Sequence, residues 1–462
     1  MKELFKNTNH LHFIGIGGIG MSGMAELLFN HGFIISGSDI NESERIKHLK
    51  KCGLKIFNKH DKDNIKKCDL IVYSSAIKKD NPEIKEGYKR NIPIIKRAEL
   101  LGELINVKKI SIAVSGTHGK TTTSSMVGSI LHEAELDPTL IIGGIVNKFE
   151  SNNISGSGDI IVVEADEFDK SFLSLKPTFS IINNLDFEHI DCYKDFKSLK
   201  NTFLDFTNSI PFYGKIIINN DCKNLNTIVN KINKQKKSFG IKNKSEIMAK
   251  NIIFSKNYSS FKLIQNENDS IEINLNSPGI HNVYNALAAA TICLELNVSL
   301  EVIKLGLEKY TGVKRRFEIS HQNKNNGIMI VDDYAHHPIE VAATLNAAKS
   351  GWEKRIIAVF QPHLFSRTKN FYKEFAESLS IADIIIITDI YAAREEKIPD
   401  VTSDLIINEL NKKTSKVLYI KEVNDIPHQI KKIVKNNDMI ICMGAGNINK
   451  ISIKINQEMS IK

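Results

Sequence analysis

The chain has 462 residues, which at ~100–200 residues per domain favours three domains, and its 42% apolar content can fill several packed cores. Subtracting 53 acidic from 62 basic residues leaves a net charge of +9, carried mostly by scattered lysines. Nucleic-acid binders more often concentrate positive charge in a stripe with aromatic residues, so we expect no nucleic-acid partner, whereas small anions remain suitable ligands.

The sequence lacks the signals of secretion and membrane insertion. Its six cysteines are isolated from one another, which favours reduced thiols over disulfides. No apolar run approaches the ~18–20 residues of a membrane span, and the N-terminus lacks the apolar stretch of a signal peptide. We therefore expect a cytoplasmic protein with no membrane span.

Short apolar strands alternate with helical patterns along most of the chain, which is typical of βαβ units and parallel sheets. A strand followed by a glycine loop and a helix occurs near the N-terminus and again from residue 108. The expected strands are residues 11–16, 33–39, 69–75, 108–116, 160–166, 179–185, 215–220, 329–335, 355–362, 383–390, 417–420 and 438–446.

Residues 237–276 differ from this pattern. Period-2 alternation there, as in 270–275, predicts a small antiparallel insert, and two helical patterns follow it. The pattern as a whole predicts an α/β protein of three domains with mainly parallel sheets. The expected domains are residues 1–107, 108–313 and 314–462.

The first glycine loop has the form G-x-G-x-x-G between a strand and a helix. Glycines allow a tight turn and bring backbone N–H groups and the helix N-terminus against a diphosphate. Asp39 ends the next strand, where a ribose-binding acid would lie. The motif indicates a site for a dinucleotide, such as NAD or FAD, or a nucleotide sugar; a turn needed only for packing is the alternative. Its glycines are Gly15, Gly17, Gly18 and Gly20.

The second glycine loop contains the G-K-T core of a phosphate-binding loop, although Val114 replaces the leading glycine of the full Walker spacing. Consecutive N–H groups can wrap phosphates, Lys120 can reach the β- and γ-oxygens, and the Thr121 hydroxyl can ligate Mg²⁺. The flanking strand and helix fit this use, so we predict a triphosphate site. The loop residues are Gly116, Thr117, His118, Gly119, Lys120, Thr121 and Thr122.

Acidic residues and a histidine follow two later strands of the same region. Glu164 and His189 would emerge at the carboxyl edge of the sheet, where ligands of doubly wound folds bind. They are candidate ligands for a divalent ion, and a solvated acid and a loop-packing histidine are the alternatives. A metal or a cationic substrate would offset the charge of the acids at these edges, which are Asp166, Glu167, Asp186, Glu188 and Asp191.

Polar residues also interrupt the apolar patterns of the C-terminal half. Asn282 and Asn285 lie one turn apart at the start of an apolar helix, where Asn282 could cap the helix or the two amides could face an adenine edge. Arginine is scarce, yet Arg316 and Arg367 fall in dense polar segments, and a guanidinium suits a phosphoryl oxygen or a carboxylate. For Arg315 we expect surface solvation.

Taken together, seven segments resemble the Mur ligase family of ATP-dependent amide ligases in peptidoglycan synthesis. The resemblance spans the chain in the family's order and implies N- and C-terminal Rossmann-like domains flanking a central P-loop-type ATPase domain. The segments are HFIGIGGIGMSG (12–23), SGTHGKTT (115–122), EADEFDKSF (164–172), HNVYNALAA (281–289), KRRFE (314–318), DDYAHHP (332–338) and FQPHLFSRT (360–368).

The resemblance also implies substrates and residue roles. It reassigns the first glycine loop to a UDP-sugar and implies UDP-N-acetylmuramate, L-alanine and ATP as substrates, Mg²⁺ as cofactor, and a monomer or weak homodimer. Lys120, Arg316 and His336 would be catalytic, and Thr121, Glu164 and His189 would organise Mg²⁺. Asn282 and Asn285 would face the adenine, Asp333 would lie near the ribose, and Tyr334, His363, Arg367 and Ala445 would frame L-alanine.

This chain departs from the family pattern in places. Phe203 stands about where several relatives carry a carbamylated lysine, so no carbamate ligand is expected, and Leu364 replaces a basic residue of some relatives. Three other functions remain open: a recycling ligase of the same family that attaches a preformed peptide, an NAD-dependent oxidoreductase, and a nucleotide-binding regulatory module without turnover. The oxidoreductase leaves the second glycine loop unexplained.

Overall fold

The computed structural model describes residue 5 and residues 8–148, 151–188, 192–267, 269–393, 395–413 and 416–460. The chain divides into two compact units. Within the described residues, no helix has both the length and the apolar character needed to cross a membrane. Unit 1 comprises residues 1–248, 264–271 and 285–309, and unit 2 comprises residues 249–263, 272–284 and 310–462.

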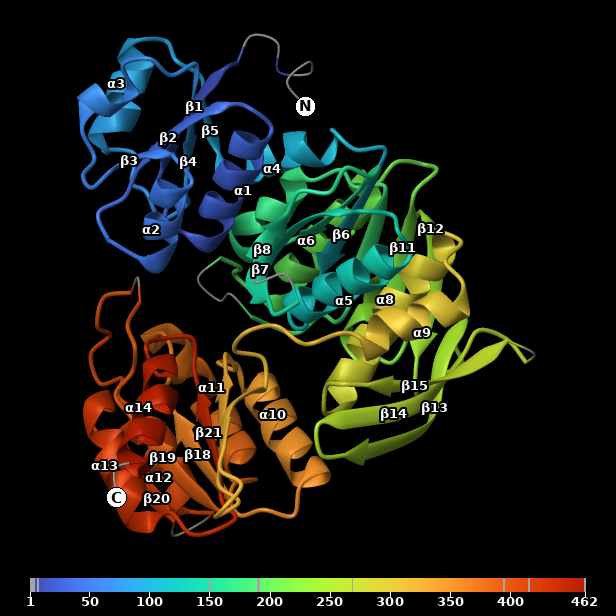
Figure 1. The fold of residues 1–462 in the computed structure, drawn as a ribbon, viewed down its shortest axis with the longest axis vertical. Helices are drawn as coiled ribbons and strands as arrows, with labels where there is room; N and C mark the ends of the chain where they lie inside the picture. Colours follow the sequence, from blue (N-terminus) through green and yellow to red (C-terminus); the bar gives the residue numbers. More distant parts are fainter. Residues whose placement is uncertain are drawn as a thin grey trace. The chain divides into compact units, whose positions relative to one another are not determined.

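The N-terminal part of unit 1 is a parallel five-stranded sheet of order β3-β2-β1-β4-β5. Asn81 caps α3 by accepting the N–H of Glu83 at 2.9 Å, and Pro82 suits the first helical position. The strands are β1 (His10–Ile14), β2 (Ile34–Ser38), β3 (Lys55–Phe57), β4 (Leu70–Tyr73) and β5 (Ile94–Lys96); the helices are α1 (Ile19–Asn30), α2 (Glu44–Lys51), α3 (Pro82–Lys89) and α4 (Arg97–Ile105) (Figure 1).

A second sheet has the order β15-β14-β13-β12-β11-β10-β6-β9-β7-β8, with β7–β8 antiparallel and the pairs from β12 to β7 parallel. Strands β13–β15 occupy the expected insert. The strands are β6 (Ile110–Ser115), β7 (Thr139–Val146), β8 (Ser151–Ile154), β9 (Ile160–Glu164), β10 (Phe179–Ile182), β11 (Lys215–Asn219), β12 (Gln235–Gly240), β13 (Ile247–Ser255), β14 (Tyr258–Ile264) and β15 (Ser270–Leu275).

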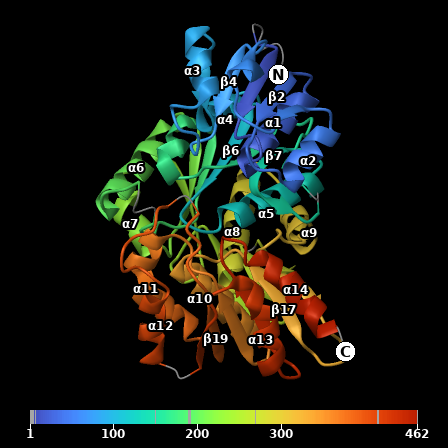
Figure 2. The same cartoon turned by 90° about the vertical axis from the view of Figure 1, so that its left-hand side faces the viewer.

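Helices α5 and α9 of unit 1 pack closely because Gly306 leaves room for the α5 backbone: a Cβ at Gly306 would lie 2.5 Å from Cα of Ile130. Ser129 then donates to the Gly306 carbonyl at 2.7 Å. The helices of this region are α5 (Lys120–Glu133), α6 (Phe196–Ser209), α7 (Lys223–Val229), α8 (Ile280–Glu295) and α9 (Leu300–Glu308) (Figure 2).

Unit 2 is built on a sheet of order β16-β17-β21-β18-β19-β20, parallel except for the edge strand β16. Its central strands are buried on both faces, and each face carries its own apolar core. The elements are β16 (Glu318–Gln322), β17 (Met329–Asp333), β18 (Ile356–Phe360), β19 (Ile384–Ile387), β20 (Val417–Tyr419) and β21 (Met439–Met443), with α10 (Pro338–Gly351), α11 (Phe365–Leu379), α12 (Asp404–Asn411), α13 (Ile426–Ile433) and α14 (Asn449–Ser460) (Figure 1).

The predicted fold class, α/β with mainly parallel sheets, is confirmed. Both glycine loops lie at the carboxyl end of a strand inside a parallel sheet, where open α/β sheets bind ligands. The domain boundaries at 107/108 and 313/314 stay predictions.

Candidate active site

The second glycine loop joins β6 to α5 and adopts backbone conformations that require glycine. Gly116 and Gly119 have φ of +124° and +80°, in the left-handed region. A Cβ at Gly119 would also lie 2.5 Å from Oδ1 of Asn285. The chain then enters α5 at Lys120, so the free N–H groups of the first helical turn lie beside the loop.

Lys120 is held inside the loop by oxygen atoms. Its Nζ donates to the Gly116 carbonyl and to Oε2 of Glu167, each at 2.8 Å, and lies 3.9 Å from Oδ1 of Asp166. Burial alone would lower the pKa of Lys120, but Glu167 and Asp166 outweigh it and raise the pKa, so the ammonium stays charged. Glu167 is fixed in turn, because the Tyr193 hydroxyl donates to its carbonyl at 2.5 Å.

Side chains that follow β10, together with Asn285 on α8, hold the loop through a network of hydrogen bonds. The Thr123 hydroxyl donates to Oδ1 of Asn285 at 3.1 Å and accepts from the Asn183 amide at 2.9 Å. The His118 N–H donates to Oδ1 of Asn184 at 2.8 Å, and the Thr117 hydroxyl donates to the Asp186 carbonyl at 3.1 Å. The sequence-predicted loop residues thus rest on the ends of β10 and the start of α8.

Two of the three predicted metal ligands lie within the described residues. Thr121 is buried in the first turn of α5, and Glu164 ends β9, where its Oε1 accepts the Gly143 N–H at 2.7 Å. A hydroxyl and a carboxylate are oxygen donors of the kind Mg²⁺ prefers, so these residues fit that ion. His189 and Asp191 lie outside the described residues.

Asn282 and Asn285 both lie near the start of α8, but the capping alternative for Asn282 is wrong. The helix begins two residues earlier, at Ile280, and the Asn282 amide donates to the Pro278 carbonyl at 2.7 Å. Oδ1 of Asn285 accepts the hydrogen bond from the Thr123 hydroxyl described above. Their assignment to adenine stays a prediction.

The first glycine loop joins β1 to α1, with Gly15 at φ +78°. The Gly17 N–H donates to Oδ2 of Asp39 at 2.9 Å, and Oδ1 of Asp39 accepts the Asn41 N–H at 3.0 Å. Gly20 leaves room for the Arg97 guanidinium, which would lie 3.0 Å from a Cβ there. Asp39 therefore stabilises the loop through the Gly17 N–H. This contact is separate from the ribose contact expected of Asp39 from the sequence.

Unit 2 gathers several predicted residues around Glu340 on α10. Nη1 of Arg316 lies 3.8 Å from Oε1 of Glu340, and Nδ1 of His336 lies 3.2 Å from Oε2. The Arg316 guanidinium also lies over the Tyr334 ring, 5.2 Å from its centre. Burial lowers the pKa of His336 well below its ordinary value, so the imidazole is neutral at pH 7.

The predicted amino-acid residues His363 and Arg367 lie together at the start of α11. Nη1 of Arg367 lies 3.2 Å from Nδ1 of His363, whose ring stacks on Tyr391 at 5.8 Å and meets the His336 ring edge-on at 5.9 Å. Ala445 lies half-buried after β21.

Asp333 organises the backbone at the end of β17. Its carboxylate accepts the N–H groups of Phe317 at 2.8 Å and Ala335 at 2.7 Å, and the Gly444 N–H donates to its carbonyl at 3.1 Å. Burial raises the pKa of Asp333. The predicted ribose contact would therefore come from a carboxylate that also fixes the path of two neighbouring segments.

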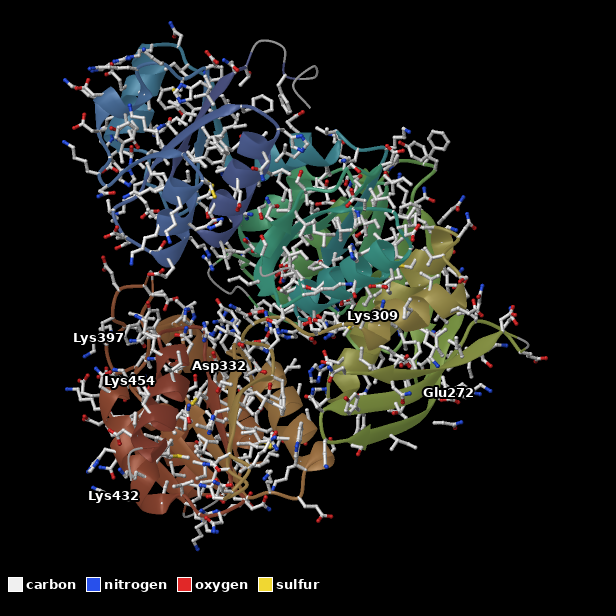
Figure 3. All side chains as sticks on the ribbon, viewed as in Figure 1. Glu272, Lys309, Asp332, Lys397, Lys432 and Lys454 are labelled. Carbon is white, nitrogen blue, oxygen red and sulfur yellow. The ribbon has the colours of Figure 1, made fainter. Side chains whose placement is uncertain are left out.

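Arg315 was missed from the sequence, and surface solvation was the wrong expectation for its side chain. Its guanidinium donates to the Gly444 carbonyl at 2.6 Å and lies 3.3 Å from the carboxylate of Asp332, which is labelled in Figure 3. Burial raises the pKa of Asp332 to about 6. Glu340 was also missed. The repeated acids and arginines of 314–318 and 332–340 were the available signal, but spacing alone could not pair them.

The chain matches known proteins over nearly its whole length. It is 45% identical over 457 residues to the UDP-N-acetylmuramate–L-alanine ligase of Persephonella marina, covering 98% of each chain. The UDP-N-acetylmuramate-alanine ligase MurC of Thermotoga maritima has a similar structure, with a TM-score of 0.83, 29% identity and coverage of 97% of this chain and 99% of that one. A murein peptide ligase from Psychrobacter arcticus gives a TM-score of 0.72 and 26% identity, covering 98% and 99%.

Three family domains match in chain order. Residues 10–109 match the Mur ligase family, catalytic domain; residues 114–293 match the Mur ligase middle domain; and residues 315–446 match the Mur ligase, glutamate ligase domain. The seven segments of the sequence resemblance fall almost entirely within these matches. By both sequence and fold, the chain belongs to the Mur ligase family.

Proposed function

We propose that this protein is an ATP-dependent ligase that joins L-alanine to the lactyl carboxylate of UDP-N-acetylmuramate, releasing ADP and phosphate. The observation that carries the proposal is the half-buried, charged Lys120 in a glycine loop at a helix N-terminus, because a fixed cation beside free N–H groups suits a triphosphate. The 45% identity to a ligase of that name supports the choice of substrates.

The first chemical step makes the carboxylate reactive. An oxygen of the lactyl carboxylate attacks the γ-phosphorus of ATP. The bond between the γ-phosphorus and the oxygen that bridges it to the β-phosphate breaks. ADP departs, and the substrate is now an acyl phosphate. Negative charge gathers at the transferred group, so the catalytic residues act by position and electrostatics. Lys120 supplies a fixed positive charge and the loop N–H groups hold the phosphates, while we assign Arg316 and His336 to the phosphoryl group.

Thr121, Glu164 and, from the sequence, His189 would hold Mg²⁺ beside the phosphates. The ion would supply further charge neutralisation there. Glu167 stays with Lys120 and keeps the ammonium oriented toward the loop. Asn282 and Asn285 are assigned to the adenine and Asp333 to the ribose, whereas Gly15, Gly17, Gly18, Gly20 and Asp39 are assigned to the UDP-sugar.

The second step forms the amide bond. The neutral amine of L-alanine attacks the acyl carbon, phosphate leaves with the electron pair of the carbon–oxygen bond, and the nitrogen loses one proton as it becomes an amide. Arg367, close to His363, suits the amino-acid carboxylate because a guanidinium can form two parallel hydrogen bonds to it. Tyr334 and Ala445 are assigned to the rest of the alanine pocket. We place the reaction in the cytoplasm and expect a monomer or weak homodimer.

ADP formation with UDP-N-acetylmuramate and one added amino acid at a time tests this proposal. We expect turnover with L-alanine. Turnover only with a tripeptide would indicate a peptide-recycling ligase instead, and binding of a nicotinamide cofactor without ADP formation would indicate an oxidoreductase. ATP binding without substrate-dependent phosphate release would indicate a regulatory module.

A further inference from the structure

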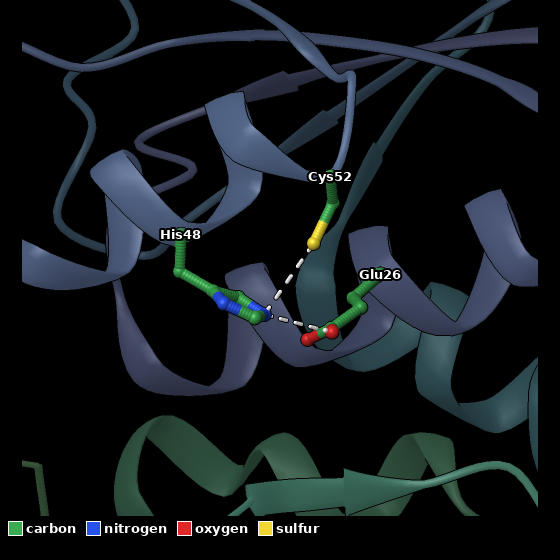
Figure 4. A group of neighbouring side chains, drawn as sticks. All are labelled: Glu26, His48 and Cys52. Atoms are coloured by element: carbon green, nitrogen blue, oxygen red, sulfur yellow. Dashed lines mark hydrogen bonds and ion pairs between the residues drawn. The ribbon is translucent and has the colours of Figure 1, made fainter.

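Three side chains of the first two helices converge outside both glycine loops. Glu26 lies on α1, His48 lies on α2, and Cys52 follows the last residue of α2 (Figure 4). Nε2 of His48 lies 3.0 Å from Oε1 of Glu26 and 3.6 Å from Sγ of Cys52. We propose that these three residues form a binding site for Zn²⁺ or a similar borderline-soft divalent ion.

The three donor atoms lie close enough together to surround one tetrahedral ion. Bond lengths of about 2.3 Å to sulfur and about 2.0–2.1 Å to nitrogen and oxygen place tetrahedral ligand atoms about 3.3–3.6 Å apart. The Nε2–Sγ separation of 3.6 Å lies within this range, the Nε2–Oε1 separation of 3.0 Å is slightly shorter, and one donor atom from each residue lies within 4.8 Å of the other two. Three protein ligands leave the fourth position to water.

The backbone holds the donors in place. His48 and Cys52 are four residues apart, and the Cys52 N–H donates to the His48 carbonyl at 3.0 Å, so both side chains lie on one face of the last helical turn. Glu26 comes from the neighbouring helix. Two of the three ligands are therefore positioned before an ion binds.

The donor set selects the ion. A thiolate, an imidazole and a carboxylate suit Zn²⁺, whereas Mg²⁺ prefers oxygen ligands, so the Mg²⁺ assigned to the phosphate site would not compete here. Burial and the nearby Glu26 raise the pKa of Cys52, so the free thiol is protonated and an ion must displace its proton. An ordinary ion pair of Glu26 with His48 would not require the thiol.

Such an ion would tie together the two helices that flank the first glycine loop. Helix α1 follows the loop directly, and Cδ1 of Ile46 on α2 would lie 3.0 Å from a Cβ at Gly17. We therefore expect Zn²⁺ to raise the Tm of the full chain by several degrees, with no requirement for ATP.

Cobalt titration of the reduced full-length protein tests the site, because Co²⁺ bound to a thiolate has a charge-transfer absorption. We expect one equivalent of Co²⁺ to produce this absorption and one equivalent of Zn²⁺ to remove it. Cys52→Ser should abolish the absorption, Glu26→Gln should weaken Co²⁺ binding at least tenfold, and the matched thiol control Cys222→Ser should leave both unchanged.

Either of two results would overturn the proposal: no charge-transfer absorption in the native chain, or an absorption that persists in Cys52→Ser. Circular dichroism of each variant checks folding, which we expect to be intact because His48 and Cys52 are exposed. Ligase turnover is a separate measurement, so failure of the metal site leaves the proposed function standing.

Discussion

The two glycine loops of unit 1 share a backbone design but differ in charge. Each follows a strand within a parallel sheet and precedes a helix, and each contains a glycine in the left-handed region, Gly15 in the first and Gly119 in the second. The first loop carries no charged side chain, and its partner is the carboxylate of Asp39. The second holds Lys120 against two carboxylates.

The difference shows what each loop can do. Backbone N–H groups alone can hold a diphosphate that remains intact, whereas transfer of a phosphoryl group gathers charge that a fixed cation must stabilise. The first sheet has its own buried charge, the carboxylate of Glu83, which lies between His12 and His60.

The largest expected effect is on turnover. Lys120→Ala should abolish amide formation, with a loss of at least ~10²–10³ in rate, because phosphoryl transfer at the second loop requires the lysine charge. Binding of UDP-N-acetylmuramate should be unchanged, because the first loop does not use this lysine. Steady-state ADP release and calorimetric titration measure the two effects. The control Lys109→Ala removes a surface lysine paired with Asp159 and should change neither. Near-native turnover of Lys120→Ala would show that the second loop does not bind the triphosphate as assigned.

Glu83→Gln should lower the free energy of unfolding by about 3 kcal/mol, because it breaks a buried charge network. Burial alone would raise the pKa of Glu83, but the interaction with His12 and the Ser38 hydrogen bond hold the pKa below its ordinary value. The carboxylate therefore stabilises the fold above that ordinary pKa and ceases to do so as the pH falls through the folded-state value.

The difference between native protein and Glu83→Gln should accordingly shrink in acid, as measured by urea unfolding at a series of pH values. Glu86→Gln on the same helix removes only a surface pair with Arg90 and should cost under about 1 kcal/mol. Equal costs for the two variants at neutral pH would contradict the buried-network account.

Gly119→Ala and Gly18→Ala compare the same substitution in the two loops. Alanine at Gly119 meets Asn285 at 2.5 Å in a left-handed conformation, and we expect a cost of about 2 kcal/mol in unfolding free energy. Gly18 has φ of −64° and its nearest contact is 3.6 Å away, so its substitution should change stability by less than about 0.5 kcal/mol. Chemical unfolding measures both, and a reversed order would refute the loop geometry.

The smallest effect concerns Asp39. If its main role is to accept the Gly17 N–H, Asp39→Ala should weaken UDP-sugar binding about tenfold, whereas Asp39→Asn should retain most of the affinity because an amide oxygen also accepts. Titration calorimetry compares the two variants. Equal losses in both would favour the ribose role expected from the sequence.

Much of the fold followed from the sequence because apolar strands that alternate with helices through glycine turns form few arrangements other than parallel βαβ sheets. The strand at 108–116 and the helix after it lie where predicted, as β6 and α5. The loop glycines were found because positive φ values leave a clear residue signature.

Partners distant in sequence could not be predicted. The pairing of Lys120 with Glu167 spans 47 residues and depends on which strands are neighbours in the sheet. The contact of Arg315 with the Gly444 carbonyl spans 129 residues and depends on β17 lying next to β21. The capping alternative for Asn282 failed because α8 starts at Ile280, directly after the Pro278-Gly279 pair.

The most direct test of phosphoryl activation uses UDP-N-acetylmuramate labelled with ¹⁸O in its lactyl carboxylate. If that carboxylate attacks the γ-phosphorus, one labelled oxygen must appear in the released phosphate when L-alanine is added, and Lys120→Ala must release none. Unlabelled phosphate accompanied by normal amide formation would contradict the account.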